Sequence, residues 1–293
     1  MIAFIFVIQT LRIAVPYLFA AMGGVISEKA GLIALALEGY MLTGAFCAAI
    51  GAYYTGSAWM GVLAGMTGAT VMAMIYSVAT VRFRADQVVI GIAINLMAIG
   101  ATRFFLRLAF DSAANSPRVD GFGDRVSGTG AATLAANPLF WMALIAVAFV
   151  YWLLFRTPFG LRIRAVGEHP AAAVSVGVPV ARIRYAAVAL SGAIAGLGGV
   201  YLALDQHKFS SEMTAGRGFI ALAATIFGRW HPVRAAIACL FFAAAETLQI
   251  QLQGRELVPS QFLDMIPYLL TIIALAGIVG RVRPPAALGK VTD

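Results

Sequence analysis

The sequence predicts an all-α fold, a polytopic transmembrane helical bundle. Hydrophobic residues make up 61% of the 293 residues and charged residues only 12%, which is about half the charged share of an ordinary soluble domain. Apolar runs close to the ~20 residues needed to cross hydrocarbon recur along the whole chain. These runs are continuously apolar and do not alternate with polar residues, which favours helices over the strands of a membrane barrel.

The apolar runs predict about nine spans, and eight to ten are compatible with their ends. The first run has no basic segment before it, so we expect it to be retained as a span and not removed as a secretory signal. We expect residues 1–293 to form a single transmembrane domain, because no polar stretch is long enough to build a soluble one. The expected spans cover residues 3–26, 33–54, 58–80, 87–107, 137–155, 183–204, 217–229, 233–252 and 265–280.

Two of these spans are predicted to be interrupted. The stretch GRGFIALAATIFGRW, residues 216–230, is too short to cross a membrane untilted, and ISEKAGLIALALEG, residues 26–39, carries charges directly before an apolar run. A membrane tolerates a broken helix only where protein or a water-filled cavity covers its backbone. A third stretch, SGAIAGLGG at residues 191–199, has small residues at four-residue spacing, which predicts close packing of helix backbones.

Basic residues indicate how the chain is threaded. If the spans alternate in direction, the loops on one side hold thirteen of the 21 basic residues, and the excess of Lys and Arg marks that side as cytoplasmic. The N-terminus is then outside and the C-terminus inside. The net charge of +8 is therefore a signal of topology, and it predicts no nucleic-acid partner. The thirteen are Lys29, Arg82, Arg84, Arg156, Arg162, Arg164, Arg182, Arg184, Arg229, Arg234, Arg281, Arg283 and Lys290.

The motifs of familiar enzymes are absent from the sequence. There is no HExxH or CxxC for a metal, no G-x-x-x-x-G-K-[ST] for the phosphates of ATP, and no G-x-S-x-G elbow for a nucleophile. The three histidines, His169, His207 and His231, are far apart in the sequence and in loops or at span ends. We therefore expect no catalytic residues, no bound metal and no cofactor of its own in this chain.

Polar side chains at membrane depth are the candidates for a solute path. Glu38 and Glu246 lie within apolar runs, where an ionisable group costs several kcal/mol unless it faces a partner or water. Asn95 shares a helical face with small residues, and Gln249 shares one with Glu246. Phe219, in the short seventh span, is a candidate for stacking on a solute. The alternative is that these groups hydrogen-bond neighbouring helices and only hold the bundle together.

The longest predicted cytoplasmic loop, residues 156–184, contains the polar stretch RAVGEHPAAAVSVGV. Gly167 and Pro170 mark the start of a helix, and Gly177 with Pro179 marks its end. We expect one short helix that lies across the membrane face between basic ends. Such a helix suits the docking of another protein, although an interfacial helix without a partner fits the composition equally well.

Three stretches carry a resemblance to a known family. RAVGEHPAAAVSVGV resembles the cytoplasmic coupling loop of bacterial ABC-importer permeases for branched-chain amino acids, simple sugars and nucleosides. SEKAGLIALALEGYMLTGAF, residues 27–46, and GRGFIALAATIFGRWHP, residues 216–232, resemble the branch that is paired with basic-membrane-protein lipoproteins and takes up nucleosides. The resemblance extends over residues 20–285.

The resemblance implies the rest of a transport system. It implies that this chain is one half of a transmembrane dimer, completed by a second related permease or by a second copy. A separate ABC ATPase would bind the ATP and Mg, and an external substrate-binding lipoprotein would deliver a small-molecule solute. The solute would cross by alternating access. Carried over by position, the residues expected to couple to the ATPase are Gly167, Glu168, His169, Pro170, Ala171 and Ala172.

The leading interpretation is a permease subunit of an ATP-driven importer for nucleosides or related neutral polar solutes. Within the same class, a permease for simple sugars such as ribose or galactose is the alternative. A stand-alone secondary transporter would have symmetric halves with paired short helices, and the sequence shows no such repeat. A membrane enzyme is the least supported interpretation, because no catalytic motif is present.

Overall fold

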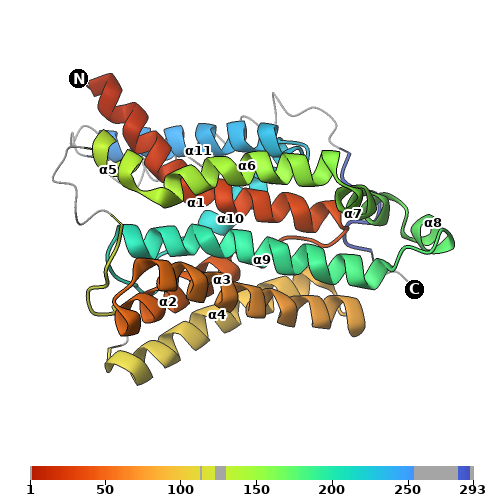
Figure 1. The fold of residues 1–293 in the computed structure, drawn as a ribbon, viewed down its shortest axis with the longest axis horizontal. Coiled ribbons are helices and arrows are strands. Elements are labelled where there is room, and N and C mark those ends of the chain that lie inside the picture. The colour runs from red at the N-terminus through yellow and green to blue at the C-terminus, as the bar shows by residue number, and fades with distance from the viewer. Residues whose placement is uncertain (1, 113, 123–129, 254–282, 291–293) are drawn as a thin grey trace.

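The computed structural model describes residues 2–112, 114–122, 130–253 and 283–290. These residues are almost entirely helical, as the apolar runs predict (Figure 1). The helices, with one π-helical turn labelled η1, are α1 (Ile2–Lys29), α2 (Leu37–Thr55), α3 (Ala58–Ser77), η1 (Val78–Arg82), α4 (Gln87–Phe110), α5 (Ala131–Ala136), α6 (Pro138–Arg156), α7 (Pro158–Glu168), α8 (Pro170–Ser175), α9 (Val180–Asp205), α10 (Arg217–Phe227) and α11 (Pro232–Gln253).

Side-chain caps fix where several of the helices begin. The Asp86 carboxylate accepts hydrogen bonds from the amides of Val88 and Val89, both at 2.9 Å, at the start of α4. Asn137 caps α6 and Thr157 caps α7, and in each case a proline follows as the first helical residue. These caps satisfy amides that have no partner inside the helix, and the proline lacks the amide that would be unpaired.

Six of the described helices are long and apolar enough to cross a membrane: α1, α3 with η1, α4, α6, α9 and α11. The predicted polytopic all-α bundle is therefore confirmed. The span predicted at residues 33–54 is a helix only from Leu37 onward, and the one predicted at 217–229 is the 11-residue helix α10. The ninth span, 265–280, lies outside the described residues, so the total count stays a prediction.

Helix α9 occupies the centre of the bundle and packs against α1, α2 and α3 (Figure 1). Its small residues make this possible. A side chain on Gly199 would overlap the carbonyl oxygen of Met41 on α2 and would lie 2.8 Å from the amide nitrogen of Ala45. The close packing predicted from the small-residue stretch is confirmed, and it places the backbones of α2 and α9 in direct contact.

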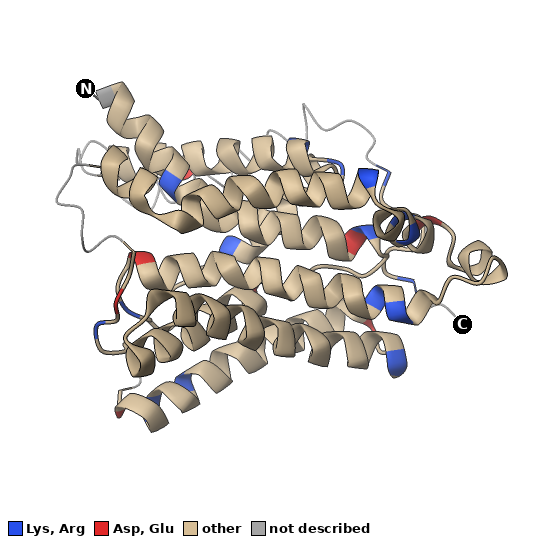
Figure 2. Ribbon diagram, in the orientation of Figure 1, with Lys and Arg blue, Asp and Glu red and all other residues tan. Residues whose placement is uncertain are grey.

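Charged residues lie mainly at the two ends of the bundle (Figure 2). One end, which we call the basic end, carries residues of the predicted cytoplasmic loops: the last residue of α1, the end of η1, the end of α6, and the starts of α9 and α11. Helices α7 and α8 and the C-terminal residues 283–290 lie at the same end (Figure 1). Helix α1 starts at the opposite end, so the described N- and C-terminal residues are separated by the length of the bundle.

The chain between α1 and α2, residues 30–36, is not helical although it is largely buried. Its backbone groups are bound by side chains from other helices. Tyr76 of α3 donates to the carbonyl oxygen of Ile33 at 2.7 Å, and the Ile33 amide donates to Gln87 of α4 at 2.8 Å. The predicted interruption before the second span is thus confirmed, and its buried polar groups are satisfied, as burial requires.

Candidate functional site

A cavity of about 370 Å³ lies between α2, α4 and the start of α10. Its volume is in the range of small-molecule sites in proteins. Three residues that the sequence singled out, Glu38, Asn95 and Phe219, line this one cavity although they come from three different helices. The full lining is Glu38, Gly39, Leu42, Ile92, Asn95, Leu96, Ile99, Glu212, Thr214, Ala215, Gly216 and Phe219.

Glu38 joins α2 to the first turn of α10. Its two carboxylate oxygens accept hydrogen bonds from the amides of Gly216, at 2.9 Å, and Gly218, at 2.7 Å. Gly216 has φ of +81°, a backbone conformation that side chains disfavour, and a side chain on Gly218 would lie 2.5 Å from the Glu38 amide nitrogen. An anion at a helix N-terminus is stabilised by unpaired amides and by the helix dipole. Glu38 is thus a buried carboxylate held against α10 at the wall of the cavity.

Asn95 of α4 hydrogen-bonds the backbone on either side of Glu38. Its carbonyl oxygen accepts from the Gly39 amide at 2.8 Å, and its amide group donates to the Leu35 carbonyl oxygen at 2.9 Å. Both partners lie at the irregular start of α2. Asn95 therefore lines the cavity and also hydrogen-bonds a neighbouring segment, which is the packing role that the sequence left open, while its part in a solute path stays a prediction.

The rest of the cavity wall is mainly apolar. Leu42 of α2 and Ile92, Leu96 and Ile99 of α4 supply aliphatic surface, and Phe219 of α10 supplies an aromatic ring. The residue Phe219 is 47% exposed. A ring beside aliphatic side chains, with a few fixed polar groups, suits a flat solute that carries hydrogen-bonding groups on its edge.

Glu246 and Gln249 are not among the residues that line this cavity. Glu246 of α11 forms an ion pair with Arg217, the first residue of α10, at 3.0 Å, and accepts a hydrogen bond from Tyr17 of α1. Gln249 is one turn further along α11 and partly exposed. For Glu246 the structure therefore shows the packing role that the sequence left open, since it ties α11 and α1 to α10.

A second buried carboxylate, Glu28, was not predicted as part of a site. It accepts hydrogen bonds from the Ala34 amide, at 3.2 Å, and from the indole N–H of Trp230 just after α10. Trp230 has φ of +54°, a conformation that is uncommon for a bulky residue. Glu28, at the end of α1, and Glu38, at the start of α2, thus hold the two ends of α10 on either side of the connection between α1 and α2.

Glu212 is a further lining residue that the sequence analysis did not single out. It belongs to residues 206–216, which precede α10, and forms an ion pair with Arg103 of α4. The same segment pairs with the loop after α4: the Ser116 amide donates to the Phe209 carbonyl oxygen at 2.9 Å. Glycine, serine and charged residues of this kind are ordinary in a solvent loop, so no local signal in the sequence marks them as neighbours.

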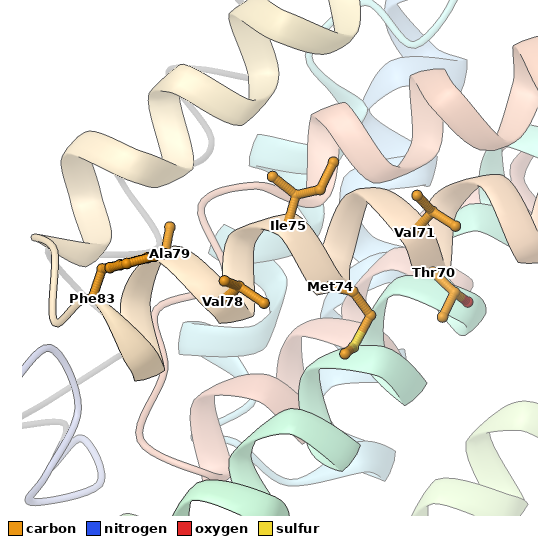
Figure 3. A pocket seen from close by; sticks show the side chains of 7 residues that line it. All are labelled: Thr70, Val71, Met74, Ile75, Val78, Ala79 and Phe83. Atoms are coloured by element: carbon orange, nitrogen blue, oxygen red, sulfur yellow. The ribbon is translucent and has the colours of Figure 1, made fainter.

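A larger cavity, of about 490 Å³, lies along the outer face of α3 and η1. Figure 3 shows that its seven lining side chains follow one face of this helix. The single hydroxyl, that of Thr70, donates to the Met66 carbonyl oxygen of its own helix at 2.7 Å. This groove offers a polar solute nothing to recognise. Its lining is Thr70, Val71, Met74, Ile75, Val78, Ala79 and Phe83.

The stretch predicted to couple to an ATPase forms two helices and not one. Gly167 and Glu168 are the last residues of α7, His169 separates the helices, and Pro170, Ala171 and Ala172 belong to α8. The predicted start at Pro170 is confirmed, but the predicted single element is wrong, because Gly167 ends a helix that starts earlier at Pro158. In Figure 1, α8 protrudes from the basic end of the bundle.

The protruding tip of α8 is apolar. Val174 is 60% exposed and Val176 is 77% exposed, and Ala171 and Ala172 are exposed beside them. Exposed apolar side chains gathered on a protruding helix are typical of a protein contact. The alanines were predicted to lie at such a contact, and the valines were not.

A bundle of membrane-spanning helices, with a lined cavity between them and a protruding helix with an apolar tip at its basic end, is typical of a membrane permease. The chain belongs to the family described as branched-chain amino acid transport system / permease component, which residues 6–275 match.

Several curated proteins are similar over nearly the whole chain. The guanosine ABC transporter permease protein NupQ of Bacillus subtilis is 40% identical, over 97% of this chain and 95% of its own length. The nucleoside ABC transporter permease protein NupC of Lactococcus lactis is 35% identical, over 97% of both chains. The putative glucose ABC transporter permease protein TsgC13 of Haloferax volcanii is 31% identical, over 93% and 91%. A more distant Bacillus subtilis protein, the guanosine ABC transporter permease protein NupP, is 21% identical over 95% and 85%. No solved structure matches the chain.

Proposed function

We propose that this chain is the permease subunit of an ATP-driven importer for nucleosides. The supporting observation is that the relatives at 40% and 35% identity, over nearly full length, are named as guanosine and nucleoside permeases. The cavity adds to this, because an aromatic ring beside fixed amide and carboxylate groups suits a nucleobase with its polar edge. The solute would enter between Glu38, Asn95 and Phe219.

The chain would work with partners that it does not contain. A separate ATPase would bind ATP and Mg and dock on the α8 tip, and an external lipoprotein would deliver the solute. Bacillus subtilis has both NupQ and NupP, which supports a second, related permease beside this one. The basic end of the bundle would face the cytoplasm of a bacterium, since Lys and Arg are retained on that side.

A simple sugar is the second candidate solute, because TsgC13 is named as a glucose permease. One experiment distinguishes the two candidate solutes. The complete transporter, with its ATPase, binding protein and second permease, is expressed in cells that lack both nucleoside and glucose uptake, and labelled guanosine and glucose are supplied in turn. We expect guanosine uptake and no glucose uptake. Uptake of glucose alone would show that the solute is a sugar and not a nucleoside. Uptake of neither solute would contradict the proposal.

Phe219 provides a test of the solute path itself. We expect Phe219→Leu, which keeps an apolar side chain but loses the ring, to raise the KM for guanosine about tenfold, because stacking of a base on an aromatic ring is worth roughly 1–3 kcal/mol. Phe241→Leu on α11 is the matched control, since Phe241 is similarly exposed, at 43%, but does not line the cavity. Equal KM values in the two variants would remove Phe219 from the path.

The α8 tip can be tested by adding charge to it. We expect Val174→Glu to reduce the amount of ATPase that co-purifies with the permease at least tenfold, because a carboxylate would be buried without a partner in an apolar contact. Tyr54→Glu is the control: Tyr54 is also exposed, at 66%, but α2 carries it to the opposite end of the bundle. Undiminished co-purification of Val174→Glu would show that the ATPase docks elsewhere.

A further inference from the structure

The C-terminal residues 283–290 lie between the docking hairpin, α7 with α8, and the irregular connection between α1 and α2. Pro285 and Ala287 are buried, and Ala287 is only 3% exposed. Figure 1 shows this end of the chain beside α7. A short segment without helix that is nevertheless buried must have its backbone groups bound by its surroundings.

On one side the segment completes the end of α7. The Ala287 amide donates to the Gly167 carbonyl oxygen at 2.9 Å, and the Ala286 amide donates to the Glu168 carboxylate at 3.3 Å. The last carbonyl groups of a helix have no partner within it. Residues of the C-terminal segment therefore act as the cap of the helix that leads into α8.

On its other side the segment packs on the connection between α1 and α2. A side chain on Gly31 would lie 3.4 Å from the Ala287 carbonyl oxygen, and one on Gly289 would lie 3.1 Å from the Cδ1 atom of Ile33. The end of α7 also touches this region directly, since a side chain on Gly167 would overlap the carbonyl oxygen of Lys29. The segment thus packs between the hairpin and residues 31–33.

Residues 31–33 continue directly into the cavity wall. The backbone of Ile33 is bound by Tyr76 and Gln87. A few residues later Asn95 binds the backbone of Leu35 and Gly39, and Glu38 binds α10. A continuous set of hydrogen bonds therefore joins the region beneath the C-terminal segment to the three elements around the cavity.

We propose that residues 283–290 are a positioning element that couples the docking hairpin to the connection between α1 and α2, and through it to the cavity. The proposal rests on the proposed function, because it assigns the hairpin to the ATPase. With the segment seated, a displacement of α7 moves residues 31–33 with it. Without the segment, the hairpin still carries its docking tip, but it reaches this connection only through the close approach of Gly167 to Lys29 and Gly31.

Truncation is the first test, done in the complete transporter reconstituted in liposomes. One variant ends after Val282 and lacks the segment, and its matched control ends after Lys290 and keeps it. We expect the shorter variant to retain the ATPase but to lose at least tenfold in the ratio of ATP hydrolysis with loaded binding protein to basal hydrolysis, and in guanosine uptake. The control stays within twofold of the full chain. An unchanged ratio in the shorter variant would overturn the proposal.

Two neighbouring substitutions decide the question if the shorter variant does not fold. Ala287→Leu overfills a buried contact, whereas Ala286→Leu makes the same change at an exposed position. We expect only Ala287→Leu to lower the stimulated-to-basal ratio tenfold, with the amount of bound ATPase unchanged. A lower yield of Ala287→Leu with a normal ratio in the folded fraction would show a structural role only and overturn the proposal. Failure of the full chain itself to bind ATPase or take up solute would instead contradict the proposed function.

Discussion

Replacing Gly199 by alanine is expected to reduce the yield of folded permease to less than a tenth. The new Cβ atom would overlap the Met41 carbonyl oxygen and lie 2.7 Å from the Met41 carbonyl carbon. Both atoms belong to the backbone of α2, so no side chain can move aside. Overpacking of a well-packed core typically costs about 1–3 kcal/mol, and here two central helices would have to separate.

The matched control for Gly199→Ala is Gly100→Ala on α4. No atom lies within 4 Å of the position that the Gly100 side chain would take, and alanine favours helix over glycine by up to about 1 kcal/mol. We expect this variant to be as stable as the parent or slightly more so. Thermal unfolding in detergent, followed by size-exclusion chromatography, compares the two. Similar transition temperatures would mean that α2 and α9 are not packed as tightly as the structure shows.

The second large effect is expected for Glu38→Gln, which should lower guanosine uptake more than tenfold. Two amides, those of Gly216 and Gly218, now donate to the two carboxylate oxygens. Glutamine offers one oxygen and turns an N–H group toward the other amide, so a buried donor loses its partner at a cost of about 1–3 kcal/mol. The first turn of α10 would shift, and Phe219 with it.

The control for Glu38→Gln is Asp205→Asn, which removes a carboxylate that does not line the cavity. Asp205 forms an ion pair with Arg12 at 2.8 Å near the opposite end of the bundle, where the Arg12 side chain is 51% exposed. An exposed pair contributes about 0–1 kcal/mol, so Asp205→Asn should leave uptake within twofold of the parent. Uptake is compared at equal amounts of assembled transporter. A Glu38→Gln transporter as active as the control would show that the carboxylate is not needed to hold α10.

Much of the fold could be predicted because its cause is local. Continuous apolar runs predict the spanning helices, and the charges and glycine at residues 28–31 predict the break before α2. Shortness alone predicts that α10 cannot cross untilted. In each case the physical reason, the length of apolar chain relative to the thickness of hydrocarbon, can be read from consecutive residues.

The candidate site could be predicted only in part. Glu38, Asn95 and Phe219 were found because a polar or aromatic group in an apolar run is conspicuous, and the structure brings them to one cavity. Glu28 was missed because it stands beside Lys29 in what looks like an ordinary loop, and its partner Trp230 is distant in the sequence. A pairing between residues so distant in the sequence depends on how the helices pack, and no pattern in consecutive residues predicts it.

The same limit applies to the hairpin of α7 and α8. Gly167 and Pro170 are valid signals of a helix boundary, and the sequence analysis used them to start one helix. The structure shows that the boundary at His169 separates two helices, because Thr157 and Pro158 start α7 earlier. The contact of Gly167 with residues near the C-terminus lies more than a hundred positions away along the chain and has no sequence signal.

Under the proposed function, the shortness of α10 sets how far a solute would travel between the cavity and the basic end. Eleven residues at 1.5 Å each give about 16 Å, roughly half of the ~30 Å of hydrocarbon in a bilayer. The cavity lies at the N-terminal end of α10, and Trp230 with the basic end lies beyond its C-terminal end. In that case the barrier to the solute would be no longer than α10 itself, and a tilt of this one short helix would be the movement that opens it.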